Sequence, residues 1–416
     1  MEREIISATI QDVRKLFIFK QHLYGEKLQG TFRNKMITIL RDAGYIQWDP
    51  VTVVAPSHMI SIWSRIGYFK AEELEKMMWN DREAFLHWVP TAWIVLTEDY
   101  PIFHSLMKNY PDSLRSGWTS HIEPAREFME SHKDLEYKVI NHLRQGPANT
   151  AQLSGYGKKE KSNDGWSTGN EVTRLMFHLH MSGRVMVSGH SKNQNVWSLT
   201  DDYLPEWTVK TEFTYKELER RTAIRALKAL GVASEQDIFG YFIRGRYLNL
   251  KSTLKDLYEE QEIVKVSIVG QPKSKSMFLL SEDVGRLDSI ISEKGENEVN
   301  LVSPFDNLLT LRKRLKRLFN FEYSLEQFVP EKKRKYGTYV LPVLYGSEMV
   351  GRIDARLDRH AGILEIKSVY AEPGYEGDEL IADKLMNRIE ELANFLNAER
   401  IVFGNKKPEK WSNYLS

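Results

Sequence analysis

Gln47 and Asp49 are the residues whose types and spacing point most directly to chemistry. In an extended strand, residues two apart point to the same side, so the Gln47 amide and the Asp49 carboxylate would face one way and Trp48 the other. Pro50 restricts the residue before it to an extended conformation, which would help to hold the Asp49 carboxylate in one direction. We therefore expect two polar groups to converge on one small site.

A fixed carboxylate beside a neutral amide suits hydrolysis of a bond whose leaving group is already positively charged. A purine alkylated at N7 or N3 carries such a charge, so its departure from C1′ of the sugar needs little help from a general acid. The carboxylate can stabilise the oxocarbenium-like sugar and accept a proton from the attacking water, and the amide can orient that water. The same polar pair is also typical of a solvated strand edge or a helix cap, and that alternative stays open at this point.

Composition limits the classes of protein to consider. A chain of 416 residues predicts two to four domains, because it exceeds what one hydrophobic core usually serves. No run approaches the roughly 18 to 20 apolar residues of a membrane helix, and the first residues do not resemble a secretion signal. The chain has no cysteine, and its 11 histidines include no His-x-x-x-His pair. We expect a cytoplasmic, monomeric protein without a metal or other cofactor.

Two segments, residues 134–200 and 216–280, share one plan about 80 residues long. Apolar spacing and turn residues in the first segment predict helices over 135–143, 150–153 and 171–181 and strands over 184–188 and 196–199. The second segment predicts helices over 223–230, 236–242 (after an N-cap at Ser234) and 250–257 and strands over 263–269 and 277–280. Three helices followed by a hairpin are the order of a winged helix-turn-helix unit.

The two ends of the chain vary this plan. Thr9 and Asp12 predict a helix cap, a later helix stops at Gly44, and residues 46–54 read as a strand, which together suggest a modified winged-helix unit. Beyond Asn300, strands are predicted over 339–345, 348–357 and 363–370, and a helix over 378–397. We expect an α+β fold with domains at 1–130, 131–207, 208–299 and 300–416.

A basic segment marks the start of the last domain. Residues 312–335 hold nine Lys or Arg against three Glu, an excess of six positive charges in a chain whose formal net charge is only +1. Such a cluster is typical of phosphate contacts, although charge runs are more often solvated faces. Winged-helix units commonly bind DNA, but tandem units also serve as scaffolds for protein contacts.

The sequence resembles the winged-helix DNA glycosylases of the AlkZ and YcaQ type. The residues that carry this resemblance are Gly44-Tyr45-Ile46-Gln47-Trp48-Asp49, Ser64-Arg65-Ile66-Gly67, Ser303-Pro304-Phe305-Asp306-Asn307-Leu308, Arg312-Lys313-Arg314, Leu318-Phe319, Tyr323, Glu326, Pro330, Lys333-Arg334, Tyr336-Gly337, Tyr339-Val340-Leu341-Pro342 and Val350-Gly351-Arg352-Ile353-Asp354. One departure is that Pro90 and Thr91 follow Phe85 and Trp88, where many relatives have a histidine.

The resemblance implies tandem winged helix-turn-helix units with a C-terminal β-barrel-like domain. It also implies an enzyme that excises alkylated purines, including bulky adducts and in some cases interstrand crosslinks, from double-stranded DNA. Gln47 and Asp49 match the Gln-x-Asp catalytic motif of the YcaQ branch rather than Gln-x-Gln of the AlkZ branch. The resemblance further implies that the damaged base need not rotate fully into a deep pocket, which suits a base that is tied to the opposite strand.

Other expectations complete the prediction. No lysine stands out as an amine nucleophile, so we expect a monofunctional DNA glycosylase acting in base excision repair. We expect DNA contacts at Arg312, Arg314, Lys316, Arg317, Arg334, Arg352 and Arg359. The rival functions are a winged-helix transcriptional regulator without catalysis, which would prefer one undamaged sequence, and a protein-interaction scaffold, which would not bind DNA in a salt-sensitive way.

Overall fold

The computed structural model describes residues 5–25, 27–89, 91–158, 170–191, 194–270, 276–292 and 297–415, so Pro90 lies outside it. The chain forms two compact units. The first unit combines Met1–Lys70, Ala223–Phe242 and Leu254–Ser416, and the second combines Ala71–Thr222 and Ile243–Thr253. Compaction thus joins segments that are distant in sequence. The domain boundaries expected from sequence remain predictions about smaller subdivisions.

Local signals set the first helices of the first unit. The side chain of Thr9 accepts the Asp12 N–H, and the Asp12 carboxylate accepts the Thr9 N–H, which confirms the predicted cap of α1 (Ile10–Lys20). Helix α2 (Phe32–Ala43) ends at Gly44, whose φ of 85° favours glycine. Strand β2 (Ile46–Gln47) and helix α3 (Ser57–Ile66) follow.

A four-stranded sheet of the first unit has the order β1-β9-β10-β8. Its strands are β1 (Ile6–Ala8), β8 (Ala233–Ser234), β9 (Ile263–Ile268) and β10 (Met277–Leu280). Strands β9 and β10 form the predicted antiparallel hairpin, and β1 adds a parallel edge beside β9. Ser234 caps α12 (Glu235–Tyr241) with Asp237, as predicted. Helix α14 (Val284–Ser292) follows the hairpin.

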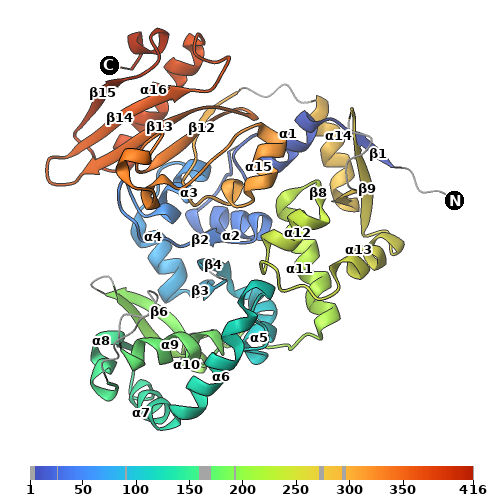
Figure 1. Cartoon of the computed structure of the whole chain (residues 1–416), viewed down its shortest axis with the longest axis vertical. Coiled ribbons are helices and arrows are strands. Elements are labelled where there is room, and N and C mark those ends of the chain that lie inside the picture. The colour runs from blue at the N-terminus through green and yellow to red at the C-terminus, as the bar shows by residue number, and fades with distance from the viewer. Residues whose placement is uncertain are drawn as a thin grey trace. The chain divides into compact units, whose positions relative to one another are not determined.

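The C-terminal part of the first unit is a five-stranded sheet in the order β11-β12-β13-β14-β15 (Figure 1). The strands are β11 (Val299–Leu301), β12 (Val340–Tyr345), β13 (Glu348–Asp358), β14 (Ile363–Ala371) and β15 (Arg400–Lys406). Helix α15 (Arg312–Phe319) lies in the chain between β11 and β12, and helix α16 (Glu379–Phe395) between β14 and β15. Sequence patterns predict β12, β13, β14 and α16 but not β15. The basic segment begins with α15, which was expected only as a charged stretch.

The expected barrel-like closure of this sheet is wrong. Helix α16 returns the chain so that β15 pairs parallel to β14, with Leu364 opposite Ile401. Strand β15 therefore extends the sheet, and in the described part of the chain β11 and β15 are its two open edges. Helix α16 buries Ile381, Leu385 and Ile389 and contacts β11 and β15.

The second unit contains the helices and hairpin predicted for residues 134–200. Its elements are α4 (Ala71–Glu75), a π-helix (Lys76–Asn80), β3 (Ala84–Trp88), β4 (Ala92–Leu96), α5 (Tyr100–Lys108), α6 (Ile122–Ser131), α7 (Lys133–Leu143), β5 (Ala148–Asn149), α8 (Thr150–Leu153), α9 (Glu171–Met181), β6 (Val185–Ser191), β7 (Gln194–Leu199) and α10 (Thr200–Tyr203). Strands β5, β7 and β6 form one sheet in that order. The predicted element order is thus present, while its use as a DNA-binding winged helix stays a prediction.

Two of the four boundaries between the units fall within helices, α11 (Tyr215–Leu230) and α13 (Leu250–Glu259). Both helices were predicted, and α11 begins earlier than its apolar pattern indicated. None of the helices in the described residues combines the length and apolar character needed to cross a membrane.

Candidate active site

Gln47 and Asp49 lie in the short connection between α2 and α3 of the first unit. Gln47 ends β2, and the Asp49 Oδ1 accepts the Val51 N–H at 2.9 Å. The Asp49 carbonyl accepts the Ser57 N–H at 3.1 Å, at the start of α3. The predicted strand over 46–54 is therefore wrong beyond Gln47, because the Asp49 side chain takes a backbone donor and turns the chain.

Because the strand ends at Gln47, it does not place Gln47 and Asp49 on one face. Strand alternation no longer applies at Asp49, and in the described structure no hydrogen bond joins the side chains of Gln47 and Asp49. What the two residues share is restricted solvent access. Gln47 is 7% exposed and Asp49 is half-buried.

Burial alters the acid–base character of Asp49. Loss of solvent raises the pKa of the Asp49 carboxyl above its ordinary value, and the Val51 N–H offsets part of this effect. A carboxylate with a raised pKa is a stronger proton acceptor than a solvated one. Asp49 is therefore suited to accept a proton from water at near-neutral pH.

Trp48 is held in place between these two residues. Its ring stacks on His58 of α3, with ring centroids 3.9 Å apart and planes 9° from parallel. His58 is itself only 4% exposed. The stack fixes the middle of the tripeptide and so restrains the residues on both sides of it.

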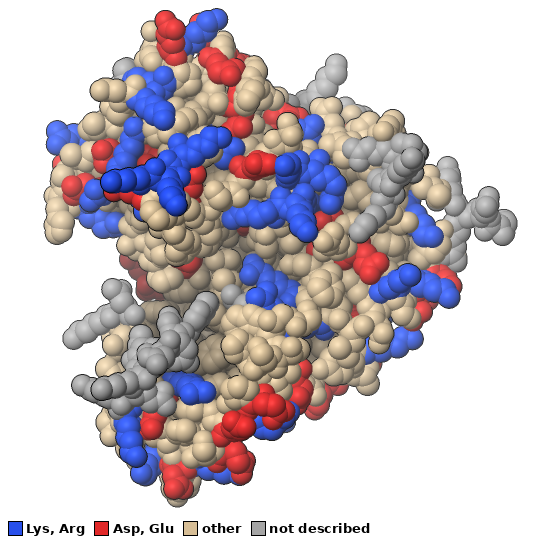
Figure 2. Space-filling model, viewed as in Figure 1, with Lys and Arg blue, Asp and Glu red and all other residues tan. Residues whose placement is uncertain are grey.

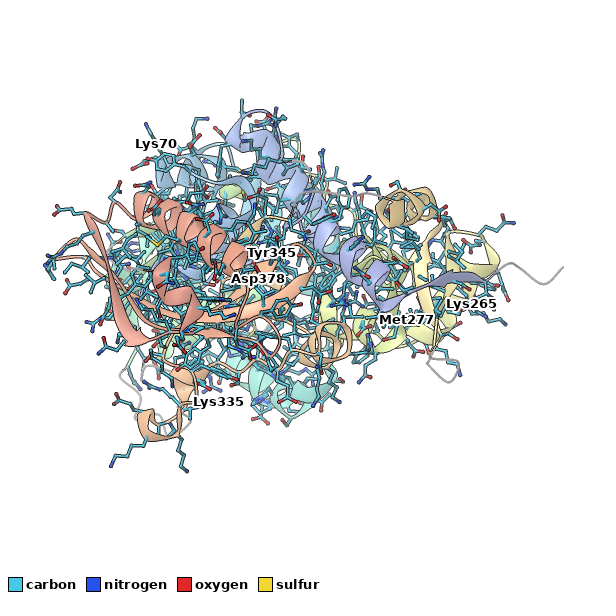
Figure 3. All side chains as sticks on the ribbon, turned by 90° about the horizontal axis from the view of Figure 1, so that it is seen from above. Lys70, Lys265, Met277, Lys335, Tyr345 and Asp378 are labelled. Atoms are coloured by element: carbon cyan, nitrogen blue, oxygen red, sulfur yellow. The ribbon has the colours of Figure 1, made fainter. Side chains whose placement is uncertain are left out.

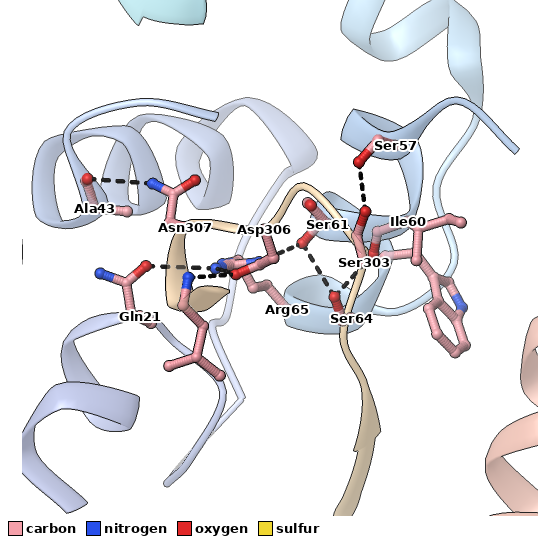
Figure 4. Close-up of polar contacts among 12 residues, drawn as sticks. Gln21, Ala43, Ser57, Ile60, Ser61, Ser64, Arg65, Ser303, Asp306 and Asn307 are labelled. Carbon is pink, nitrogen blue, oxygen red and sulfur yellow. Dashed lines mark hydrogen bonds and ion pairs between the residues drawn. The ribbon is translucent and has the colours of Figure 1, made fainter. Parts of the chain in front are cut away.

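The segment Ser303–Asn307, which carries part of the family resemblance, supports the connection from both ends (Figure 4). The Asn307 Nδ2 donates to the Tyr45 carbonyl at 2.6 Å, two residues before Gln47. The Asp306 carboxylate binds the Arg65 guanidinium of α3 through two bonds, of 2.6 Å and 2.9 Å. Both charged side chains are almost fully buried, at 1% and 0% exposure.

Three hydroxyl groups lie close to Asp49. Ser57 and Ser303 share a hydrogen bond, and the Tyr339 hydroxyl donates to the Ala55 carbonyl at 3.5 Å. Burial raises the pKa of Tyr339, and the negative charge of Asp49 raises it further. Sequence reasoning from spacing missed Ser303 and Tyr339 because they lie more than two hundred positions from Asp49. Only the runs that resemble the family, which include Ser303 and Tyr339, point to them.

Strand β13 holds the chain on the other side of Asp49. The Leu357 N–H donates to the Val53 carbonyl at 2.9 Å. Arg359 donates to the carbonyls of Thr52 at 2.9 Å and Val54 at 2.7 Å. Arg359, which was predicted to contact DNA, therefore anchors the segment that follows Asp49, and a contact with DNA stays a prediction.

Two of the predicted DNA contacts are wrong because their guanidinium groups are buried. Arg314 is 1% exposed and donates to the carbonyls of Leu230 and Val232, at 2.8 Å and 2.9 Å, and to Asp237 at 3.2 Å. Arg352 is 3% exposed and donates to Glu372 at 2.6 Å. A phosphate at the protein surface cannot reach either group. Both arginines hold the first unit together.

The remaining predicted contacts are partly engaged within the protein. Arg317 pairs with Asp237 at 2.5 Å, and Lys316 pairs with Glu322. Arg334 donates to the Glu326 and Val329 carbonyls, and the Arg312 guanidinium lies 4.6 Å from the centre of the Tyr323 ring. Lys316 is exposed, whereas Arg312 and Arg334 are half-buried. Their roles in DNA binding stay predictions.

Exposed lysines remain on the surface of the basic segment. Figure 2 shows Lys and Arg side chains gathered over α15 and over the segment after it, with acidic side chains among them. Lys332 and Lys333 are exposed in a turn of 3-10 helix (Glu331–Lys333). Side chains of this turn extend outward beside Lys335 in Figure 3. These residues, rather than Arg314 or Arg352, present positive charge to solvent.

Metal-dependent chemistry has no visible site in the described residues, where no three His, Asp or Glu side chains gather in a way that would hold a metal ion. The sequence indicated the Asp49 carboxylate and the Gln47 amide, and the structure adds the hydroxyl groups of Ser57, Ser303 and Tyr339.

Comparisons with known proteins identify the family of the chain and a similar fold. The family model described as DNA glycosylase AlkZ-like matches residues 40–395, a range that includes Gln47, Asp49, Asp306 and Tyr339. Among solved structures, the fold is similar to the DNA glycosylase AlkZ of Streptomyces sahachiroi, with a TM-score of 0.65 and 14% sequence identity. The likeness covers 96% of this chain and 99% of the other. The chain belongs to the AlkZ-like DNA glycosylase family.

Proposed function

We propose that this protein is a monofunctional DNA glycosylase that hydrolyses the N-glycosidic bond of purines alkylated at N7 or N3 in duplex DNA, including bulky or crosslinked ones. The observation that carries the proposal is the Asp49 carboxyl, which is half-buried, has a raised pKa, and is fixed by the Val51 N–H. It follows Gln47 in the Gln-x-Asp pattern of the YcaQ type.

Asp49 acts on both the deoxyribose and the attacking water. As the bond between C1′ and the base nitrogen breaks, the bonding pair leaves with the base and neutralises its positive charge. The sugar becomes cationic, and the Asp49 carboxylate stabilises it. Water then adds to C1′ and gives its proton to Asp49, which leaves an abasic sugar with a new hydroxyl group. The Gln47 amide orients that water through its donor and acceptor.

The contacts around the connection between α2 and α3 hold the Asp49 carboxylate in position before the reaction begins. A catalytic carboxylate is effective only if it does not move when charge develops on the sugar. The Asn307–Tyr45 bond and the Trp48–His58 stack restrain the chain just before Asp49. The Arg65–Asp306 pair fixes helix α3, whose first residue donates to the Asp49 carbonyl. The Tyr339 hydroxyl, whose pKa is raised by the charge of Asp49, adds a polar group near that carboxylate.

Asp49→Asn tests the proposal. The substitution keeps the shape of the side chain and removes its charge, so single-turnover release of N7-methylguanine from a duplex should slow by about 100- to 1000-fold, equivalent to about 3 to 4 kcal/mol. Gln47→Ala should slow release less, and the double variant should lose less than the sum of both effects if the two residues act on one water. Asp383→Asn, on the exposed side of α16, is the matched control.

The stability of the Asp49→Asn variant separates catalysis from folding. A carboxyl whose pKa is raised on folding favours the folded state when protonated, and that contribution is lost as the pH rises through the raised pKa. At neutral pH the charge of Asp49 therefore opposes folding. We expect the melting temperature of the variant to stay level or rise. An unchanged release rate would reject the catalytic role of Asp49. Absence of free base with the wild-type protein would favour a DNA-binding protein without catalysis.

A further inference from the structure

Three arginines converge in the second unit, outside the candidate active site. The Ser116 N–H donates to the Gly245 carbonyl at 3.4 Å, which brings Arg115 beside the segment of Arg244 and Arg246. Arg246 strengthens this junction, because it donates to the Ser113 and Ile243 carbonyls at 2.8 Å and 2.9 Å. We call Arg115, Arg244 and Arg246 the arginine cluster.

Aromatic rings hold two members of the arginine cluster. The Arg115 guanidinium lies 5.3 Å from the centre of the Trp118 ring, and that of Arg244 lies 4.9 Å from the centre of the Trp93 ring. Stacking on a ring fixes the plane of a guanidinium without using its N–H groups. Arg115 and Arg244 are half-buried, whereas Arg246 is 8% exposed. The first two therefore combine fixed orientation with access to solvent.

The charges of the arginine cluster have no counterion within the described part of the chain, where no carboxylate forms an ion pair with any of the three. Burial and the charges of the other two arginines lower the pKa of Arg246 to about 10. Burial and Arg244 lower the pKa of Arg115 as well. Partly buried like charges destabilise a protein unless an anion compensates them, so this arrangement indicates a missing anionic partner.

The backbone at the arginine cluster is strained. Ile243, Arg244 and Gly245 adopt φ values of 48°, 37° and 80° in succession. Glycine tolerates such a conformation, but a β-branched residue such as isoleucine rarely adopts it. Strain of this kind persists mainly where it serves a function. Here it sets the directions of Arg244 and Arg246 around Gly245.

We propose that Arg115 and Arg244 bind a phosphodiester group of the DNA, with the charge of Arg246 adding to the attraction. A phosphodiester presents two non-bridging oxygens that can accept two N–H bonds from a guanidinium fork, and no carboxylate among the described residues pairs with these arginines. The choice of DNA as the source of the phosphate rests on the DNA glycosylase function proposed above. The contact is independent of catalysis, because a phosphodiester is present in damaged and undamaged DNA alike.

Salt-dependent binding of an undamaged duplex tests this site in the full-length protein. The logarithm of the binding constant falls with the logarithm of salt concentration, with a slope of about 0.9 for each phosphate neutralised. The double variant Arg115→Gln/Arg244→Gln should therefore bind with a slope that is shallower by about one to two. Arg126→Gln is the matched control, since Arg126 lies in α6 of the same unit and already pairs with Asp112 and Glu123.

Two further measurements make the outcome decisive. Removal of like charges should leave the melting temperature of the double variant unchanged or higher, so that weaker binding is not due to unfolding. The proposal is overturned if the salt slope of the double variant equals that of the wild type. It is also overturned if inorganic phosphate stabilises only the wild type, beyond sodium chloride of equal ionic strength, while DNA binding is the same in both. Because the duplex is undamaged, failure of Asp49→Asn to slow excision would not affect either result.

Discussion

The basic segment over residues 312–335 and the arginine cluster differ in what surrounds their charges. The basic segment is rich in cations, but Arg314 and Arg317 share Asp237, and Lys316 pairs with Glu322. The arginine cluster has only three cations, and no described carboxylate pairs with them. The contrast teaches that the number of charges in a stretch of sequence says little about how many remain available to a ligand. Burial and pairing decide that.

The strongest test of this contrast is Arg314→Ala. Burial works to raise the pKa of Asp237, but the charges of Arg314 and Arg317 outweigh it and hold that pKa below its ordinary value. Loss of one partner of a buried pair costs about 3 to 5 kcal/mol, so we expect a large fall in the denaturation midpoint. DNA binding measured below that midpoint should keep its salt slope.

Lys313→Ala is the matched control for Arg314→Ala, because Lys313 lies on the same helix and is exposed. It should change stability by no more than about 0.5 kcal/mol. If Arg314→Ala instead left stability unchanged and flattened the salt slope, Arg314 would contact DNA at the surface. The difference between the basic segment and the arginine cluster would then not hold.

The second test concerns the exposed turn of the basic segment. Lys332 and Lys333 are exposed, and no ion pair holds either of them within the described residues. If they contact phosphates, the double variant Lys332→Ala/Lys333→Ala should flatten the salt slope by about one to two without a change in melting temperature. Lys133→Ala serves as the control, since Lys133 pairs with Glu130. A slope equal to that of the wild type would place DNA binding elsewhere.

Sequence patterns predict those elements whose signals are local. Residues 171–181 are a helix with the bounds that were expected, because the apolar spacing and the terminating Gly183 all lie within the segment. The strand expected over 46–54 ends at Gln47, because the Asp49 side chain accepts the Val51 N–H and turns the chain. The carbonyls of residues 52–54 then bind Leu357 and Arg359, about three hundred positions away. The spacing of residues within 46–54 does not reveal these distant partners.

Contacts between distant segments also limit what the sequence reveals about the candidate active site and the arginines. Gln47 and Asp49 are two positions apart in sequence, so their motif is visible, whereas their support by Asn307 comes from a distant loop. Arg314 appears in the sequence as one cation of a basic run, and its partner Asp237 lies 77 positions away. The arginine cluster joins Arg115 to Arg244 across more than a hundred residues, and no local pattern marks it.

The smallest expected effect is at the Lys316–Glu322 pair, where both side chains are exposed, at 64% and 72%. The hydrogen bond and the charge of Lys316 lower the pKa of Glu322, so the carboxylate is fully ionised at neutral pH. Because Glu322 already neutralises Lys316, Lys316→Ala should flatten the salt slope of DNA binding by less than about one. Glu322→Gln should do the opposite. It frees the lysine and so should tighten duplex binding by roughly twofold to threefold at low salt, with the gain disappearing as salt rises. Binding that is equally tight in Glu322→Gln and wild type at every salt concentration would show that α15 does not face the DNA, and would leave the exposed turn and the arginine cluster as the places to seek its path.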